Sequence, residues 1–457
     1  MAIVYDICQR ETPQRLPLLI AAHPDRPLLW RDGMAISAAQ FLAHVRQVAA
    51  QLPAAGAAVN LCEDRYAFLV AFCAIAMRGQ TNLLPSSRAH QAVDEVMAAH
   101  PGCHALGDQP LDPAPRGYHQ LPPLAQDASV EPDGELPSIP AEQVVAIGYT
   151  SGSTGTQTPN PKTWRSLHAS HAGNLAMLRT VIGPHFSIVA TVPSQHMYGI
   201  EMSVLLPLLG GVGVHAGRPF FPADVAAALA EVPAPRVLVT TPVHLRALVD
   251  SGIALPPIAA MLSATAPLSL ELAQAAEQRF GAPLLEVFGS TETCVFASRR
   301  TAVDEHWSLY PDVHLHPQPD GTQVVAPQLA QPVTLADIVS LSDGGRRFQL
   351  RGRRADLLEI AGKRASLGDL TCRLLAIPGV QDGVIFQLDE ADAIGVRRIA
   401  ALAVAPGLDE HAILDALREA IDPLFLPRPL RLVSALPRND SGKLPRVALL
   451  ALLEQHH

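Results

Sequence analysis

Lysine is nearly absent from this sequence. Lysine and arginine together number 34 among 457 residues, and the lysines are Lys162, Lys363 and Lys443, so arginine supplies almost every positive charge. An ammonium is compact and flexible, whereas a guanidinium is planar, so the two are not interchangeable at a binding site. All three lysines lie in polar stretches that contain glycine. Unless they lie there by chance, these stretches are candidate sites where an ammonium binds a ligand.

Cysteine and long apolar runs are also scarce. The six cysteines show no Cys-x-x-Cys spacing, which argues against common zinc and redox motifs and is typical of a reduced cytoplasmic protein. The longest apolar run, residues 67–77, is too short to span a bilayer and predicts a buried helix. No apolar stretch of signal-peptide length lies near the N-terminus. We therefore predict a cytoplasmic protein without a membrane span.

The chain lacks an excess of positive charge as well. Its net charge is −9 and no basic stripe is visible, which argues against nucleic acid as a partner. His100, Cys103 and His104 have a spacing that could bind a metal on a helix, but Pro101 and Gly102 would break that helix. We therefore predict no zinc site there.

Helical and strand-like patterns alternate through most of the chain, which indicates an α/β fold with mixed or parallel sheets. The length suggests about two to four domains. Residues 107–142 are rich in proline, aspartate and glycine and are interpreted as a surface connection. Residues 351–356, Arg-Gly-Arg-Arg-Ala-Asp, are typical of a domain boundary. We predict a large N-terminal domain over residues 1–350, with mixed and parallel sheets and helices, and a small α+β C-terminal domain over residues 351–457.

A loop rich in glycine and hydroxyl groups follows the apolar, β-branched run at residues 144–147, which predicts a buried strand. Its glycines allow positive φ angles that turn backbone N–H groups toward an anion, and its side chains add further donors. The residues in question are Thr150, Ser151, Gly152, Ser153, Thr154, Gly155 and Lys162. The spacing is not that of a Walker A loop. A phosphate-binding loop is favoured over a flexible linker because a strand precedes it and a lysine follows it.

Polar residues follow three other predicted strands, and strand ends are where open α/β sheets build their sites. The segment 193–199 contains His196, which is either a site residue or a structural histidine. The small residues Ser263, Ala264 and Thr265 would allow close approach of a flat ligand. Thr291 and Glu292 would suit a phosphate and Mg²⁺, although the same residues could be a helix cap.

These stretches together resemble the adenylate-forming superfamily of acyl-CoA synthetases, peptide-synthetase adenylation domains and beetle luciferase. The resemblance rests on Thr150-Ser151-Gly152-Ser153-Thr154-Gly155 with Lys162, Phe288-Gly289-Ser290-Thr291-Glu292, Asp337, Gly352-Arg353 and Ser441-Gly442-Lys443, which occur in the family's order over roughly residues 20–450. More narrowly, residues 156–164, 195–217 and the Arg-Ala-Asp joint resemble AMP-ligases of xanthomonadin and aryl-polyene pigment clusters, which implies a role in pigment biosynthesis.

The resemblance implies that ATP and Mg²⁺ convert a carboxylate to an acyl-adenylate and pyrophosphate, after which a thiol displaces AMP and forms a thioester. Thr150 to Gly155 and Lys162 would then bind the ATP phosphates. Thr291 would contact the α-phosphate or the carboxylate, and Glu292 the Mg²⁺. Lys443, carried by the small domain, would bridge the carboxylate, the α-phosphate and the ribose. The other implied contacts are Ser263, Ala264, Thr265, Phe288 and Gly289 at the adenine, Asp337 and Arg353 at the ribose, and His196, Met197, Tyr198 and Gly199 at the acyl group.

Several alternatives stay open at the level of the sequence. The acid is a small aryl acid such as a hydroxybenzoate or a medium-chain fatty acid, and the thiol belongs to CoA or to the phosphopantetheine of a carrier protein. A non-catalytic nucleotide-binding homologue is the third alternative, and the oligomeric state is open. The sequence departs from the family in the extra residues between Thr156 and Lys162. The hinge falls on Ala355 or Asp356, and Glu359 replaces a lysine usual on the small domain, with Lys363 beyond it.

Overall fold

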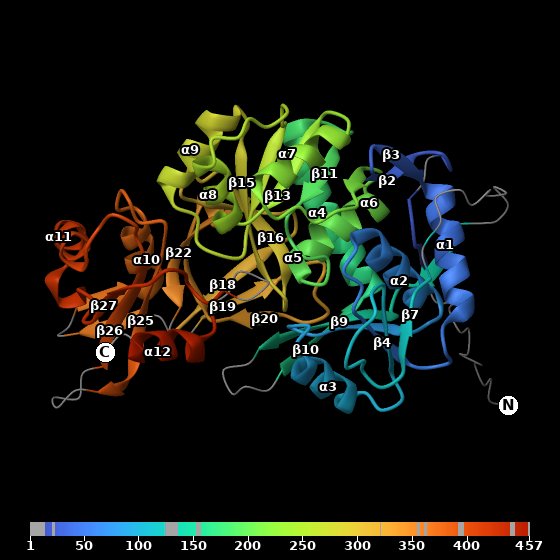
Figure 1. The fold of residues 1–457 in the computed structure, drawn as a ribbon, viewed down its shortest axis with the longest axis horizontal. Helices are drawn as coiled ribbons and strands as arrows, with labels where there is room; N and C mark the ends of the chain where they lie inside the picture. Colours follow the sequence, from blue (N-terminus) through green and yellow to red (C-terminus); the bar gives the residue numbers. More distant parts are fainter. Residues whose placement is uncertain are drawn as a thin grey trace, which may run out of the picture.

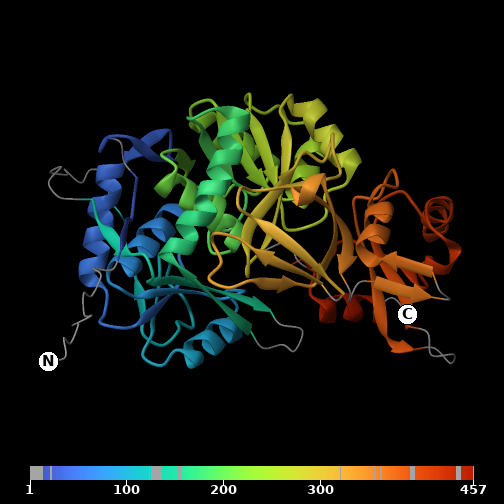
Figure 2. The same ribbon diagram turned by 180° about the vertical axis from the view of Figure 1, so that it is seen from behind.

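The computed structural model describes residues 14–20, 23–122, 124, 136–151, 157–319, 321–353, 357–360, 363–391, 397–438 and 444–455. Its two main sheets lie side by side, and a smaller α+β unit formed by the C-terminal hundred residues lies at the opposite end of the molecule from the N-terminus (Figure 1). The view from behind shows the same arrangement (Figure 2). The α/β architecture with a small α+β C-terminal unit agrees with the sequence prediction.

The largest sheet has a parallel centre with antiparallel strands at both edges. In spatial order its strands are β21 (Asp337–Ser342), β22 (Arg347–Arg353), β17 (Trp307–Leu309), β16 (Cys294–Arg299), β15 (Leu284–Ser290), β14 (Ala260–Ser263), β13 (Arg236–Thr240), β11 (Ser187–Ala190), β12 (Gly213–His215), β2 (Pro27–Arg31) and β3 (Met34–Ser37). The parallel strands β11, β14 and β15 lead into the segments that contain candidate site residues.

Helices cover both faces of this sheet, as its alternating buried side chains require. Connecting helices pack with one set of strand residues, such as Val189 and Leu238, into one core. These helices are α7 (Pro222–Glu231), α8 (Pro242–Asp250) and α9 (Leu270–Phe280). The opposite face, with Ile188 and Val239, joins the largest core. That core also receives α4 (Trp164–Ile182) and the helical run formed by α5 (Met197–Gly199), the π-helical segment η1 (Ile200–Leu205) and α6 (Leu206–Leu209).

The second sheet is mostly parallel. Its order is β10 (Gln157–Thr163), β9 (Val144–Ser151), β5 (Thr81–Leu84), β4 (Ala57–Asn60), β6 (His104–Gly107) and β7 (Tyr118–Gln120). It carries α1 (Ala38–Gln51), α2 (Arg65–Met77) and α3 (His90–Ala99). The apolar run of residues 67–77 lies in α2, and nearly all of this helix is buried, as predicted.

Two sequence predictions about connections were wrong. Residues 157–163, interpreted as part of a loop, form the edge strand β10 and pair antiparallel with β9. Pro159 and Pro161 lie two residues apart on this edge, so their missing N–H groups both face away from β9 and cost no ladder hydrogen bond. Residues 107–142 are more than a surface connection, because β7 extends the second sheet and β8 (Ser138–Pro140) pairs with β1 (Arg15–Pro17).

The remaining elements of the large part lie beside the β16–β22 edge: β18 (His314–Gln318), β19 (Gly321–Val325), β20 (Val333–Leu335) and the short 3-10 turn η2 (Asp343–Gly345). The C-terminal part contains β23 (Leu357–Ile360), β24 (Lys363–Ser366), α10 (Leu367–Leu375), β25 (Asp382–Ala391), β26 (Arg397–Val404), α11 (Glu410–Ala420), η4 (Pro423–Phe425), β27 (Leu430–Leu432) and α12 (Arg446–Glu454).

The C-terminal part has hydrophobic clusters of its own, built around residues such as Leu374, Ala401 and Leu449. The boundary predicted between residues 350 and 351 falls within β22, whose last residue, Arg353, still pairs with the large sheet. A division into two moving domains therefore stays a prediction, and its natural place is after β22. The hinge candidates Ala355 and Asp356 lie outside the described residues.

Candidate active site

Three segments that are distant in sequence meet at the end of β9. A Cβ atom built on Gly148 would lie 3.0 Å from Cγ2 of Thr291 and 3.6 Å from Cε of Met197. Gly148 belongs to the strand before the glycine-rich loop, Met197 begins α5, and Thr291 follows β15. The absence of a side chain at position 148 lets the predicted phosphate, acyl and magnesium segments come together. The predicted site is therefore contiguous at this point.

Lys162 connects the β9–β10 hairpin to the same place. Its side chain is buried, with 4% exposure, and its Nζ donates a hydrogen bond of 2.8 Å to the backbone oxygen of Glu292. The ammonium has three N–H donors. One of them is used in this bond, and no other hydrogen bond or ion pair of Lys162 is found within the described part of the chain. A rigid strand thus presents a buried cation beside the turn that carries Thr291 and Glu292.

The turn after β15 is a β-hairpin connection between β15 and β16, so the alternative of a helix cap was wrong. Gly289 is needed because a Cβ atom there would lie 2.2 Å from the carbonyl oxygen of Cys294. The backbone N–H of Ser290 donates to Oγ1 of Thr293 at 3.1 Å, and the N–H of Thr293 donates to Oγ of Ser290 at 3.3 Å. These reciprocal bonds fix the turn that holds Thr291 and Glu292.

The segment that contains His196 is held by close backbone packing. A Cβ atom on Gly199 would lie 1.8 Å from the carbonyl oxygen of Pro193, so a side chain would displace the start of the helix. His196 is the residue immediately before α5. Met197 and Tyr198 belong to the first helical turn and are buried. The segment 193–199, a polar and aromatic cluster in the sequence, is thus helical in its second half.

Arg65 is a residue that the sequence analysis missed. It is buried at the start of α2, and its guanidinium donates to Oγ of Ser194 at 3.1 Å, to Oγ of Ser203 and to the carbonyl oxygens of Ala190 and Val192. Burial lowers the pKa of Arg65 to about 10, which leaves it charged at neutral pH. It therefore ties the end of β11 to η1. A charged residue at the start of an otherwise apolar helix was the available signal.

The predicted adenine residues lie at the end of β14. Ser263 is fully buried, and no hydrogen bond to its Oγ is found among the described residues. Thr265 has a φ angle of +80°, which is unusual for a β-branched residue and typical of strained functional positions. Phe288, by contrast, places its ring against Phe296 and Trp307, with ring centroids 5.4 and 5.2 Å away. Its side chain therefore has a packing role.

The two predicted ribose residues are brought together by the sheet. Asp337 begins β21 and is the direct cross-strand partner of Arg353 at the end of β22. This register places the two residues opposite each other in the β21–β22 pair. Five predicted site residues, Gly152, Ser153, Thr154, Gly155 and Lys443, lie outside the described residues, and only the backbones of Ser151 and Arg353 are described.

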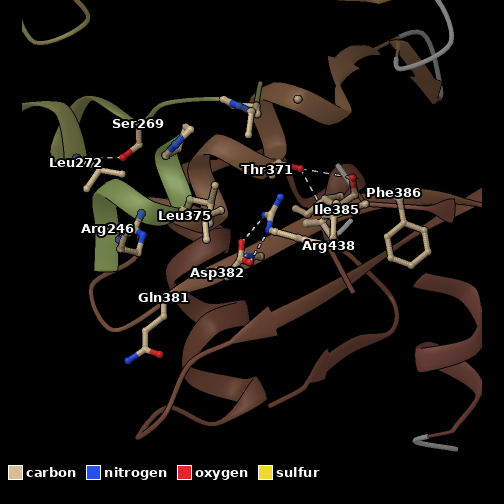
Figure 3. A pocket seen from close by; sticks show the side chains of 18 of the residues that line it. Arg246, Ser269, Leu272, Thr371, Leu375, Gln381, Asp382, Ile385, Phe386 and Arg438 are labelled. Carbon is tan, nitrogen blue, oxygen red and sulfur yellow. Dashed lines mark hydrogen bonds and ion pairs between the residues drawn. The ribbon is translucent and has the colours of Figure 1, made fainter. Parts of the chain in front are cut away.

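A cavity of about 630 Å³ lies between the large part and the C-terminal part (Figure 3). Its large-part wall is formed by α8 with Arg246 and by the segment of Ala266 and Pro267, which directly follows Thr265. Its other wall includes Arg438, whose guanidinium makes two hydrogen bonds, of 2.9 and 2.6 Å, to Asp382. The cavity therefore adjoins the predicted adenine segment.

His244 on α8 lies behind the same wall. Its Nδ1 and Oγ1 of Thr191 are 2.8 Å apart, and its ring packs against that of Phe220. Burial, assisted by the charge of Arg218, lowers the pKa of His244 to about 4. This histidine is therefore neutral at neutral pH and acts as a packing and hydrogen-bonding group.

Comparison with known proteins agrees with this geometry. A family model described as AMP-binding enzyme matches residues 19–333. The chain belongs to the AMP-binding enzyme family. A 4-coumarate–CoA ligase of Rhodobacter capsulatus is 30% identical over 310 residues, which are 68% of this chain and 77% of that relative. The AMP-binding fold and this likeness make the protein an enzyme of the acid–thiol ligase class, which forms acyl-adenylates.

Solved structures of this fold cover nearly the whole chain. An anthranilate CoA ligase in complex with anthranoyl-AMP superposes with a TM-score of 0.77 at 15% identity, covering 96% of this chain and 98% of that one. An o-succinylbenzoate CoA synthetase from Bacillus subtilis, in complex with its acyl-adenylate, gives 0.78 at 17% identity, covering 94% and 96%. A structure of the same synthetase holds ATP and a magnesium ion. At such identities the likeness supports the fold of this AMP-binding enzyme.

No helix among the described residues is long and apolar enough to cross a membrane. Within the same residues no three histidine, cysteine, aspartate or glutamate side chains gather in a way that could hold a metal ion.

Proposed function

We propose that this enzyme uses ATP to adenylate a small aryl carboxylic acid and then transfers the acyl group to a thiol. The observation that carries the proposal is the meeting of Gly148, Met197 and Thr291, with Lys162 bonded to Glu292. The hairpin of Gly148 and Lys162 and the turn of Thr291 are both expected to contact the ATP phosphates. They lie beside Met197, which belongs to the segment expected to bind the acid. Bringing the carboxylate and the α-phosphate together supplies most of the catalysis that such a reaction needs.

In this proposal the carboxylate oxygen of the acid attacks the α-phosphorus of ATP, and the bond from the α-phosphorus to the bridging oxygen breaks as pyrophosphate leaves. Lys162 offers N–H donors to the phosphates, and Thr291 offers its hydroxyl to the α-phosphate or the carboxylate. Ser263, whose buried hydroxyl is available, flanks the adenine with Ala264 and Thr265. The thiol then attacks the acyl carbon, and AMP leaves.

A magnesium ion fits the donor set beside Lys162. Mg²⁺ is usually bound through one or two carboxylates together with substrate phosphates. The side chain of Glu292 is partly exposed, and its carboxylate makes no hydrogen bond or ion pair within the described part of the chain. Glu292 would hold the ion, which would neutralise negative charge on the phosphates during the reaction.

The acid is proposed to be aromatic, such as a hydroxybenzoate. The likeness to a 4-coumarate–CoA ligase and the resemblance to pigment-cluster AMP-ligases favour this class. ATP–pyrophosphate exchange tests it: with a panel of hydroxybenzoates, cinnamates and C6–C12 fatty acids, we expect kcat/KM for the best aryl acid to exceed that for the best fatty acid by about 10²-fold. Preference for a fatty acid would overturn the substrate class, and no exchange with any acid would favour a non-catalytic nucleotide-binding homologue.

The acceptor is proposed to be the phosphopantetheine thiol of CoA or of a carrier protein, entering through the cavity beside α8. The cavity is lined by Ala266 and Pro267, which follow the predicted adenine segment, and Arg246 is a half-buried cation on its wall. CoA carries three phosphates, whereas a carrier-bound arm carries one. The two acceptors are therefore distinguishable by their dependence on arginine side chains near the cavity mouth.

We expect Arg246→Ala to raise KM for CoA about tenfold, which corresponds to the loss of one charge-assisted hydrogen bond, and to leave exchange unchanged. The measurement is thioester formation with the best acid at varied CoA concentration, repeated with a holo-carrier protein. Asp250→Asn, on the same wall, is the matched control and should not raise KM. Equal KM values for CoA in the wild type and Arg246→Ala would remove Arg246 from the acceptor path.

A further inference from the structure

Glu201 is a buried charged residue that the roles above leave unused. It lies in η1, four residues after Met197, and its exposure is 1%. Between Gly199 and Leu209 it is the only charged residue in an otherwise apolar stretch. Interruptions of an α-helix by π-helical turns are frequent at functional sites. Burying a carboxylate costs free energy unless it is hydrogen-bonded or paired, so its partners explain why it can lie there.

The partners of Glu201 come from two other elements. Its Oε1 accepts from Oγ of Ser170 and, at 3.1 Å, from Nδ2 of Asn174, both on α4. The backbone N–H of Val295 on β16 lies 3.1 Å from each carboxylate oxygen. The described partner of Oε2 is thus a donor, so an O–H on this atom would have no acceptor there. The arrangement suits a carboxyl group that accepts hydrogen bonds at both oxygens.

A second layer fixes the amide that serves Glu201. The hydroxyl of Tyr310 donates to Oδ1 of Asn174 at 3.0 Å, which directs Nδ2 of that amide toward Glu201. A Cβ atom on Gly173 would lie 2.6 Å from the ring of Tyr310. A glycine in the middle of a helix normally costs stability. At this position glycine lets the ring of Tyr310 approach α4. The hydroxyl of Tyr310 can then hold the Asn174 amide in the orientation that binds Glu201.

Glu201 connects this site to the predicted magnesium turn. Val295 is the cross-strand partner of Gly289, and the turn with Thr291 and Glu292 lies between them. Glu292 in turn accepts the hydrogen bond of Lys162. Burial raises the pKa of Glu201 above its usual range, while the bonds from Ser170, Val295 and Asn174 and the positive charge of Lys162 act in the opposite direction.

We propose that Glu201 is a positioning residue: its carboxylate anchors the base of the Thr291–Glu292 turn through the backbone N–H of Val295. The inference rests on the proposed function in so far as that turn and Lys162 bind ATP. Through one side chain, the helix that begins with the acyl-pocket residues is connected to the turn that meets the phosphates. Glu201 acts on ATP through these groups and does not touch the nucleotide itself.

The test compares Glu201→Gln with Ser170→Ala and with Leu229→Ala. The amide in Glu201→Gln keeps the shape, removes the charge and places an N–H₂ among converging donors. Ser170→Ala keeps the charge and removes one hydrogen bond. Leu229 is buried in the core around α7, away from this network, so its replacement by alanine lowers the melting temperature without touching the turn. Each variant is measured by thermal unfolding, ATP–pyrophosphate exchange and calorimetric titration with ATP.

For Glu201→Gln we expect kcat/KM for ATP to fall about 10- to 100-fold, because misplacement of a binding group by about 1 Å has effects of this size. The Kd for ATP should rise with it, whereas KM for the acid should change less than about twofold. Ser170→Ala should show a smaller change in the same direction, and Leu229→Ala a lower melting temperature only.

Glu201→Gln that loses thermal stability like Leu229→Ala, with Kd and KM for ATP unchanged, would reduce Glu201 to a structural residue and overturn the inference. The Kd for ATP is read without turnover, so it tests Glu201 even if the wild type exchanges pyrophosphate with no acid. That second result would contradict the proposed function alone.

Discussion

Replacing Lys443 with alanine is expected to lower ATP–pyrophosphate exchange by about 10²–10³-fold, the usual effect of removing one charge that stabilises a transition state. The resemblance to adenylate-forming enzymes implies that this ammonium bridges the attacking carboxylate and the α-phosphate. Such a contact forms mainly during the reaction, so the Kd for ATP should stay nearly unchanged. The described residues that flank it, Arg438 and Leu444, both line the cavity between the large and the C-terminal parts.

Lys363→Ala is the matched control for Lys443→Ala, because it removes the other lysine of the C-terminal part by the same change. Exchange measures the first half-reaction alone, and in this control it should keep the wild-type rate. Unaltered exchange in Lys443→Ala would exclude the bridging role. Weaker ATP binding in proportion to the lost rate would instead assign Lys443 to ground-state binding.

The sequence predicted best those elements whose ends carry a physical signal. The pattern of residues 270–280, ended by Gly281, predicts an amphipathic helix, and α9 has those bounds: Ser269 caps its start and Gly281 takes a left-handed conformation at its end. The sequence likewise predicts that Asp64 caps the apolar helix, and Asp64 caps α2 in the structure. The two prolines of β10, by contrast, argue for a loop unless the strand is known to be an edge. Whether a strand lies at the edge depends on how all the strands of the sheet pair, which the local sequence does not show.

The contacts of the candidate site could be predicted only in part. The sequence named Thr291, Lys162 and His196 separately, while their distances depend on how two sheets pack. Asp337 and Arg353 became cross-strand partners only when the register of β21 and β22 was known. Glu201 was missed because its partners come from α4 and β16, which no local pattern relates to it. A lone carboxylate in an apolar stretch was the signal.

The hairpin lysine should behave differently from the lysine near the C-terminus. Lys162→Met is expected to lower exchange by about 10²-fold and to raise the Kd for ATP, since its ammonium already lies beside the Thr291–Glu292 turn before any reaction. Methionine keeps most of the length of the side chain at this buried position, so the melting temperature should change little. Calorimetry with ATP, exchange and thermal unfolding are measured on the same preparations.

Lys162→Arg separates the charge from the shape. A guanidinium is planar and larger than an ammonium. Nζ of the buried Lys162 lies 2.8 Å from the backbone oxygen of Glu292, so a larger group there would have to shift. We therefore expect Lys162→Arg to recover less than about a tenth of the activity lost in Lys162→Met. Full activity in either variant would show that the buried ammonium is a structural support of the β9–β10 hairpin. A raised Kd in Lys162→Met beside an unchanged Kd in Lys443→Ala would assign ground-state binding to the hairpin and transition-state stabilisation to the C-terminal part.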